Sequence, residues 1–202
     1  MKGKLFAVSG PSGVGKNTIL NLIMERRESV QYSVSATTRE MRPGEVDGKS
    51  YYFLTRPDFE AMIERGELLE HAEYVGNYYG TPLKPILEAM ERGIDVVMDV
   101  EVVGALNIKK RLPEAVLVFV LPPSFAELRR RLLERGDVSP EAMEQRLTRA
   151  RWECAQAPGY DYNLINDDLQ SAADRMDAIM TAEKNKAAEH KCFVEQLIKE
   201  EL

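Results

Sequence analysis

The stretch GPSGVGKNT, residues 10–18, follows a short apolar run at 5–9 and precedes a helical pattern. It matches the phosphate-binding pattern G-x-x-x-x-G-K-[S/T] until its end, where Asn17 replaces the hydroxyl and Thr18 comes one place late. A glycine-rich turn between a strand and a helix directs backbone N–H groups and the helix N-terminus at phosphate, and Lys16 can reach the outer phosphate oxygens. The alternative is a glycine-rich turn that matches by chance, but the flanking strand and helix favour a working loop. The predicted nucleoside triphosphate site comprises Gly10, Pro11, Ser12, Gly13, Val14, Gly15, Lys16, Asn17 and Thr18.

Around this loop, short apolar runs alternate with helical patterns. The β-branched runs at 94–100 and 116–121 are typical of strands that are buried on both faces. Strand–helix alternation predicts an α/β fold with a mostly parallel sheet and helices on both faces. The other expected strands are 5–9, 32–35, 51–54, 68–75 and 162–166, and the expected helices are 17–27, 57–65, 82–92, 124–135, 139–154 and one long charged helix from 169.

The stretch 34–93 differs from the rest of the chain, because its strands are closely spaced and it is rich in Tyr, Gly and Arg. We interpret it as a lobe inserted into the core. The core is then formed by residues 1–33 and 94–202.

Composition excludes several classes of function. The chain has 202 residues, a net charge of −6, two histidines and two cysteines. The acidic balance argues against a nucleic-acid-coating protein, and the cysteines and histidines show no zinc or disulfide pattern. No apolar stretch approaches the roughly 20 residues of a membrane span, and no signal peptide is evident at the start. We therefore expect neither nucleic acid nor membrane as a partner.

A carboxylate follows the apolar run at 94–98. Asp99 would lie at the end of a strand beside the phosphate loop, where it could hold magnesium through water. The alternative is a solvated aspartate at a strand end, and the loop upstream favours the metal.

The insert carries groups that suit a nucleoside monophosphate. Arg39 and Arg42 lie close together, with Tyr51 shortly after, and guanidinium forks bind phosphate oxygens bidentately. Glu70 can accept hydrogen bonds from the N1–H and N2 amino group of guanine, and the Thr81 hydroxyl can serve O6. Adenine presents the opposite pattern, so a carboxylate there would reject it. The alternative is a polar surface lobe with unrelated charge pairs.

Together these segments resemble guanylate kinases up to about Leu169. The resemblance is carried by GPSGVGK, SVSATTRxxRPGEVDG, GNYYGT, LPPS, RRLLERG and YNLINDD. It implies a P-loop kinase core with a parallel sheet flanked by helices, an inserted GMP-binding lobe and a helical lid at about 131–146. It also implies transfer of the ATP γ-phosphate to GMP, and to dGMP, with Mg²⁺ as the cofactor.

The resemblance also implies roles for individual residues. The guanine contacts would be Ser35, Glu70, Thr81 and Glu101. The GMP phosphate contacts would be Arg39, Arg42, Tyr51 and Tyr79. The catalytic cations would be Lys16 and the lid arginines Arg131, Arg135 and Arg146. Asn166 would lie near the adenine of ATP, and Asp99 and Asn17 would serve the metal.

Three features depart from the family pattern. Asn17 replaces Ser, Thr or Gly after the lysine, Val103 replaces a glutamine near the GMP pocket, and the tail beyond Leu169 is unusually long. A catalytically inactive binding module of the same family, and a kinase for another small phosphate ester, are the alternatives. We expect a monomer or homodimer in the cytoplasm, with the terminal helix packed on the core rather than forming a dimer contact.

Overall fold

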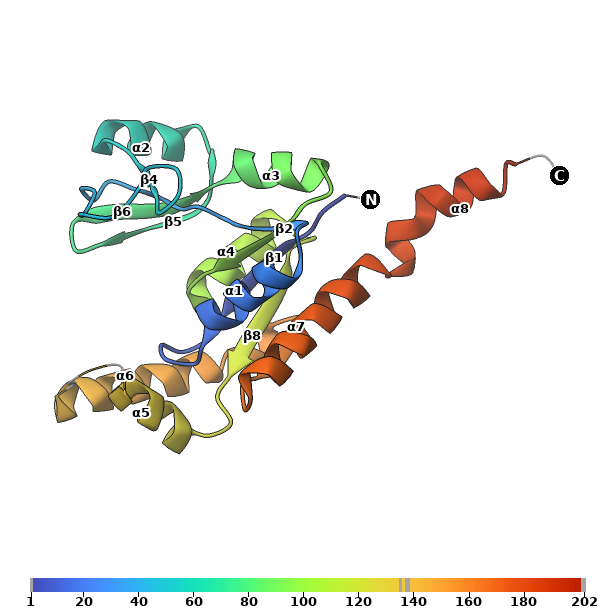
Figure 1. Cartoon of the computed structure of the whole chain (residues 1–202). Helices are drawn as coiled ribbons and strands as arrows, with labels where there is room; N and C mark the ends of the chain where they lie inside the picture. Colours follow the sequence, from blue (N-terminus) through green and yellow to red (C-terminus); the bar gives the residue numbers. More distant parts are fainter. Residues whose placement is uncertain (1, 135, 137–138, 201–202) are drawn as a thin grey trace.

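The computed structural model describes residues 2–134, 136 and 139–200. Its core is a five-stranded sheet in which all neighbouring strands are parallel, as Figure 1 shows in part. This confirms the predicted α/β class. Parallel strands end at the same edge, so the segments after β1 and β7 lie together, with Val8 opposite Asp99. In spatial order the strands are β2 (Val30–Tyr32), β7 (Asp95–Asp99), β1 (Leu5–Ser9), β8 (Val116–Leu121) and β9 (Tyr162–Ile165).

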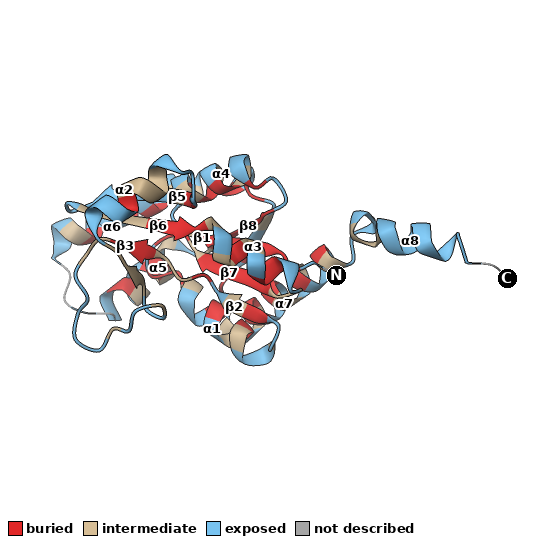
Figure 2. Cartoon of the chain, turned by 90° about the horizontal axis from the view of Figure 1, so that it is seen from above, coloured by how far each residue is buried: buried red, intermediate tan, exposed pale blue. Residues whose placement is uncertain are grey.

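The central strand β1 is buried on both faces, because its alternate side chains enter two different clusters. Phe6 and Val8 pack with α1 and α7, whereas Leu5 and Ala7 pack with α3 and α4. Helices therefore cover both faces, and the buried strands between them are visible in Figure 2. The helices around the core are α1 (Lys16–Arg26), α3 (Leu83–Glu91), α4 (Val102–Arg111), α5 (Phe125–Glu134), α6 (Pro140–Cys154) and α7 (Leu169–Lys184).

The insert has a sheet of its own, which lies above the core in Figure 1. A hairpin joins its two longest strands, and Val75 and Gly76 at the turn both have positive φ (48° and 73°), as a two-residue hairpin turn requires. Phe59 of α2 is completely buried beneath this sheet together with Leu68. The elements are β4 (Tyr52–Phe53), β3 (Ala36–Thr37), β6 (Asn77–Pro82), β5 (Leu68–Tyr74) and α2 (Arg56–Glu64).

Strands β3 and β6, helix α4 and the short η1 (Ala157–Gly159) were missing from the sequence-based expectations, and the strand expected at 32–35 is wrong beyond Tyr32, where β2 ends. Strand β6 carries a glycine in its interior, and α4 begins Val102-Val103-Gly104, which are poor helix formers. Both elements form because tertiary contacts override local preference: β6 pairs with β3 and β5, and α4 buries Val102, Ala105 and Ile108. The helix expected at 82–92 begins one residue later, with Pro82 as its N-cap.

The expectation of one long helix from residue 169 is wrong. Helix α7 ends at Lys184, and Lys186 has extended backbone (ψ 137°) before the short η2 (Ala187–His190) and α8 (Lys191–Leu197). The Lys4 ammonium binds the Glu189 carboxylate at 2.7 Å, which ties η2 to the start of the chain.

The expected packing of the terminal helix holds for α7 and is wrong for α8. Helix α7 buries Ala172, Ala173, Met176 and Met180, whereas α8 has no buried residue and extends away from the core in Figures 1 and 2. Among the described residues, the structure has no helix with the length and apolar character that crossing a membrane needs.

Candidate active site

The loop between β1 and α1 has the backbone geometry of an anion-binding turn. Gly10, Gly13 and Gly15 all have positive φ (147°, 86° and 99°). At Gly15 a Cβ would lie 2.5 Å from the Asn166 amide nitrogen, so a side chain cannot fit there. That amide donates to the Val14 carbonyl oxygen at 2.7 Å and braces the loop from the end of β9. The loop is therefore held open toward a phosphate by its own backbone and by one distant side chain.

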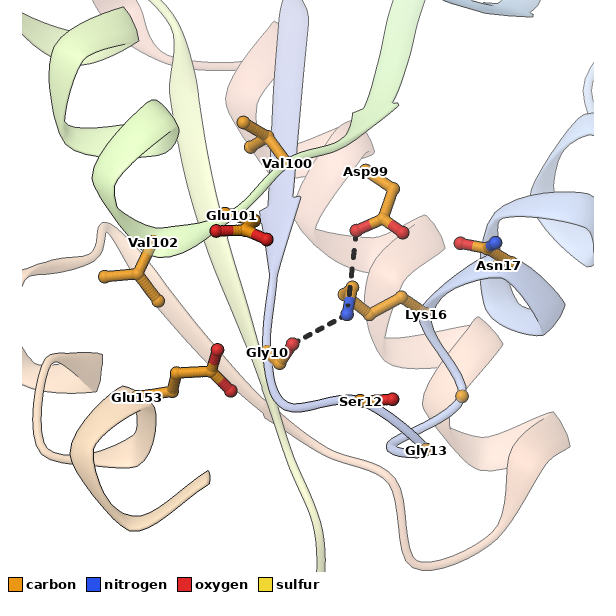
Figure 3. A pocket seen from close by; sticks show the side chains of 11 residues that line it. Gly10, Ser12, Gly13, Lys16, Asn17, Asp99, Val100, Glu101, Val102 and Glu153 are labelled. Atoms are coloured by element: carbon orange, nitrogen blue, oxygen red, sulfur yellow. Dashed lines mark hydrogen bonds and ion pairs between the residues drawn. The ribbon is translucent and has the colours of Figure 1, made fainter. Parts of the chain in front are cut away.

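Lys16, at the start of α1, lies between the loop and β7. Its ammonium donates to the Gly10 carbonyl at 2.6 Å and is 3.6 Å from the Asp99 carboxylate (Figure 3). Burial raises the pKa of Asp99, and the Lys16 charge partly opposes that shift. These two groups line a cavity of about 290 Å³, whose other lining residues are Gly10, Ser12, Gly13, Gly15, Asn17, Val100, Glu101, Val102 and Glu153. We call it the phosphate cavity.

The donors around this cavity fit a hard cation bound mainly through water and phosphate. In Figure 3 the Asn17 side chain extends from α1 toward Asp99, so an amide oxygen and a carboxylate face the same space. The described residues contain no cluster of three His, Cys, Asp or Glu side chains that could cage a metal. Magnesium keeps several waters and needs few protein ligands, so this sparse donor set is compatible with it.

A second cavity, of about 500 Å³, lies between the insert and α4. We call it the acceptor cavity. Glu70 lines it, and the Thr81 hydroxyl donates to the Glu70 carboxylate at 2.6 Å. Burial raises the pKa of Glu70, and the Thr81 hydrogen bond partly offsets that shift. Its lining residues are Glu70, His71, Ala72, Glu73, Tyr74, Tyr79, Asp99, Val100, Glu101, Val103, Gly104 and Asn107.

The two cavities meet at the segment that follows β7. Asp99, Val100 and Glu101 line both of them. A group bound in the acceptor cavity would therefore adjoin the space in front of Lys16. This continuity is what a transfer between two bound substrates requires.

The insert arginine Arg39 is held beside the acceptor cavity by an internal partner. Its guanidinium binds Glu45 at 2.6 Å and lies over the rings of Tyr51 and Phe53. The hydrogen bond that Arg39 donates to Glu45 raises the pKa of Arg39. Tyr51 in turn packs edge-on against Tyr79, with ring centroids 6.1 Å apart. The structure thus brings together three of the four predicted phosphate contacts of the insert.

Other predicted residues lie farther out. Arg42 is exposed, and its backbone N–H binds Glu45 at 2.7 Å. Ser35 is half-buried just before β3. Arg146 is exposed on α6 and does not line either cavity. Arg135 lies outside the described residues.

Arg131 and Asn166 lie on the other side of the loop. The Arg131 guanidinium binds Glu127 at 2.8 Å and the Asn166 carbonyl at 3.0 Å, and it approaches the Val14 carbonyl at 3.4 Å. Both residues line a separate hollow with Gly13, Gly15, Thr18, Glu134 and Leu169. This position suits the nucleoside part of a nucleotide whose phosphates occupy the loop.

The residues that sequence reasoning missed at or beside the cavities include four polar side chains. His71 and Asn107 line the acceptor cavity, Glu153 lines the phosphate cavity, and Arg149 binds both Glu153 and Glu101. A signal existed for Asn107, because it lies four residues after Val103 and so on the same face of a helix. Arg149 and Glu153 come close only through the position of α6, which sequence spacing does not reveal.

A parallel sheet, a phosphate loop with its lysine and a second cavity adjoining the first define a P-loop phosphotransferase that acts on a small acceptor. The sequence profile of the guanylate kinase family matches residues 2–183. The chain therefore belongs to the guanylate kinase family.

Individual relatives agree with the profile. The guanylate kinase of Thermus thermophilus is 50% identical over 187 residues, which span 93% of this chain and 84% of that protein. The guanylate kinase of Halalkalibacterium halodurans is 50% identical over 182 residues, or 90% and 89% of the two chains. A crystal structure of guanylate kinase from Anaplasma phagocytophilum has a TM-score of 0.72 at 34% identity, covering 93% of this chain and 89% of that one.

Proposed function

We propose that this protein is an ATP:GMP phosphotransferase that converts GMP, and dGMP, to the corresponding diphosphate. The observation that carries the proposal is the junction at Asp99–Glu101, which lines both the phosphate cavity and an acceptor cavity that contains Glu70, the hydrogen-bond partner of Thr81. The reaction belongs to purine nucleotide metabolism. We place it in the cytoplasm, where both substrates are found.

In this proposal the core binds ATP and the insert, residues 34–93, binds GMP. The loop amides and Lys16 hold the outer phosphates of ATP, with Arg131 and Asn166 on its nucleoside side. Glu70 accepts hydrogen bonds from the guanine N1–H and N2 amino group, with Thr81, Ser35 and Glu101 as further contacts. Arg39, Arg42, Tyr51 and Tyr79 bind the phosphate of GMP.

Phosphoryl transfer requires positioning and charge neutralisation more than covalent chemistry. The GMP phosphate oxygen is already anionic, so no protein base is needed. Lys16 must leave the Gly10 carbonyl to meet the transferring phosphoryl group, and the lid arginines Arg135 and Arg146 would close over it. Lid closure also excludes water, which would otherwise hydrolyse ATP.

We propose Mg²⁺ as the metal of this reaction. Asp99, through water, and Asn17 would hold it in the phosphate cavity. The ion would neutralise the negative charge of the phosphate oxygens. Removing it with a chelator should abolish transfer, and adding Mg²⁺ should restore it.

The deciding experiment is a coupled assay of ADP formation with ATP and each of GMP, dGMP, AMP and UMP. We expect turnover with GMP and dGMP and little with AMP or UMP, since adenine cannot pair with the Glu70 carboxylate. GMP binding without turnover would identify the inactive binding module instead. Preference for a different acceptor would overturn the assignment of Glu70. Val103, which replaces a glutamine of the family pattern, would then be the first residue to test for acceptor choice.

A further inference from the structure

The phosphate cavity is strongly acidic for a site that takes polyanions. Among the described residues that line it, Asp99, Glu101 and Glu153 are acidic and Lys16 is basic. Like charges facing a phosphate cost binding energy unless a cation compensates them. Lys16 compensates Asp99, from which it is 3.6 Å away, and the other two carboxylates need a separate partner.

That partner is Arg149, on the last turns of α6. Its Nε donates to Glu153 Oε1 at 3.0 Å, and its Nη2 donates to Glu101 Oε2 at 3.2 Å. The two hydrogen bonds are donated by different nitrogens of one planar guanidinium, so the Arg149 side chain fixes both carboxylates relative to each other. The same guanidinium carbon lies 5.2 Å from the centroid of the Trp152 ring.

The two hydrogen bonds of Arg149 connect residues from two different elements that line the phosphate cavity. Glu153 belongs to α6, whereas Glu101 follows β7 and lines both cavities. Arg149 uses only Oε2 of Glu101, which leaves Oε1 able to accept from a ligand in the acceptor cavity. The Glu101 carboxylate is mostly exposed, so without this contact little else would hold its orientation.

We propose that Arg149 is a positioning residue that orients Glu101 toward the acceptor base and compensates Glu101 and Glu153. The part of this inference that concerns the base rests on the proposed function. Arg149 acts on the acceptor through Glu101, so its loss weakens binding of the acceptor, and the loss of its charge beside the phosphate cavity also weakens binding of ATP.

The contact itself can be tested without any ligand. Trp152 is the single tryptophan of the chain, so its emission reports on the guanidinium above it. Arg149→Met should change the emission intensity or maximum of the substrate-free protein. The matched control is Arg175→Met. Arg175 is an exposed arginine of α7, and its guanidinium binds the Asp167 carboxylate at 2.8 Å. Unchanged emission in Arg149→Met would overturn the contact.

The positioning role is tested by calorimetric titration of GMP and ATP into the full chain. Arg149→Met should weaken GMP binding by roughly two- to fivefold, the range of an exposed ion pair, and ATP binding by no more than that, while the Arg175→Met control stays unchanged. Arg149→Lys keeps the charge but loses the fork, so it should show the same loss for GMP. A lysine variant with parental affinity would overturn the role in orientation.

A double-mutant cycle identifies the residue through which Arg149 acts. In a Glu101→Gln background, Arg149→Met should have no further effect on GMP binding, because the contact is already weakened. An equal loss in both backgrounds would overturn the inference. A parent chain that does not bind GMP at all would instead overturn the proposed function, and the emission test would still decide whether the contact exists.

Discussion

The two cavities that meet at Asp99–Glu101 are built in different ways. The phosphate cavity is shaped mainly by backbone, through three glycines with positive φ and the start of α1, with Lys16 as its cation. The acceptor cavity is shaped by side chains, among them the half-buried Glu70, whose carboxylate accepts a hydrogen bond from the Thr81 hydroxyl. A site made of backbone tolerates changes in side chains, whereas a site made of side chains depends on each of them. The phosphate cavity should therefore accept Asn17, and the acceptor cavity should not accept changes at Glu70.

The largest effect is expected from Arg146, a predicted lid arginine that is not among the described residues lining either cavity. Arg146→Ala should lower kcat and kcat/KM together by about 10³-fold, because an arginine that acts only in the transition state contributes to both. Steady-state kinetics with ATP and GMP measure this. Arg151→Ala is the control on the same helix, since Arg151 lies over the Phe125 ring and should leave kcat unchanged. Full kcat with only a raised KM would contradict the role of Arg146.

A substitution of Glu70 in the acceptor cavity is expected to have the next largest effect. Glu70→Gln should raise the KM for GMP by roughly tenfold to a hundredfold. The carboxylate has two oxygens that can accept from the guanine N1–H and N2 amino group, whereas the amide keeps one acceptor and places an NH2 donor against the other guanine donor. The KM for ATP should stay near the parental value. Glu67→Gln provides the matched control, since Glu67 lies three residues away and pairs with Arg65. Equal losses for both substrates would show that Glu70 is structural.

Arg39 tests whether the insert also holds the acceptor phosphate. Arg39→Ala should raise the KM for GMP by about tenfold, as for a lost charge-assisted hydrogen bond, and leave guanosine binding unchanged. Competition kinetics with guanosine against GMP measure the difference. Arg65→Ala, in the same lobe and paired with Glu67, is the control. A similar loss for guanosine would mean that Arg39 mainly holds Glu45 and Tyr51 in place.

The smallest effect is expected from substitutions of Asn17 in the phosphate cavity, which is shaped mainly by backbone. Asn17→Ser and Asn17→Gly should both keep kcat within roughly tenfold of the parent, about 1.4 kcal/mol of barrier. The loop amides and Lys16 hold the phosphates in all three chains, and water can replace one metal ligand. Kinetics over a range of Mg²⁺ concentrations test this. An inactive parent that Asn17→Ser restores would show that Asn17 disables the site.

The same contrast explains which parts of the fold could be predicted from the sequence. Strands β1 and β8 were predicted residue for residue, since continuous apolar runs bounded by turn residues are decisive locally. Strand β6 and helix α4 were missed because their residues gain from partners that are distant in sequence. The break after α7 was also missed, since nothing near Asn185 reveals that Lys4 binds Glu189.

The candidate site follows the same rule. The phosphate loop was recognisable because its function depends on consecutive residues, and Lys16 and Asp99 do lie together. Glu70 and Thr81 were named together because a carboxylate and a hydroxyl suit the edge of guanine and because of the family resemblance, and in the structure the two side chains are hydrogen-bonded. Arg149 was missed because its link to Glu101 spans two elements that only the tertiary fold brings together. Sequence reasoning identified groups whose arrangement depends on neighbouring residues, such as the phosphate loop, and missed contacts between distant elements, such as that between Arg149 and Glu101.

The contact between Asn166 and the phosphate loop has a consequence for protein engineering. The loop consists of consecutive residues, which suggests a cassette that could be moved between proteins. Its shape here depends on an amide from the end of β9, which donates to Val14 and occupies the space that a Cβ at Gly15 would need. Residues 10–18 grafted onto another parallel sheet would lack that brace. The transferable unit is the loop together with the far strand of the sheet.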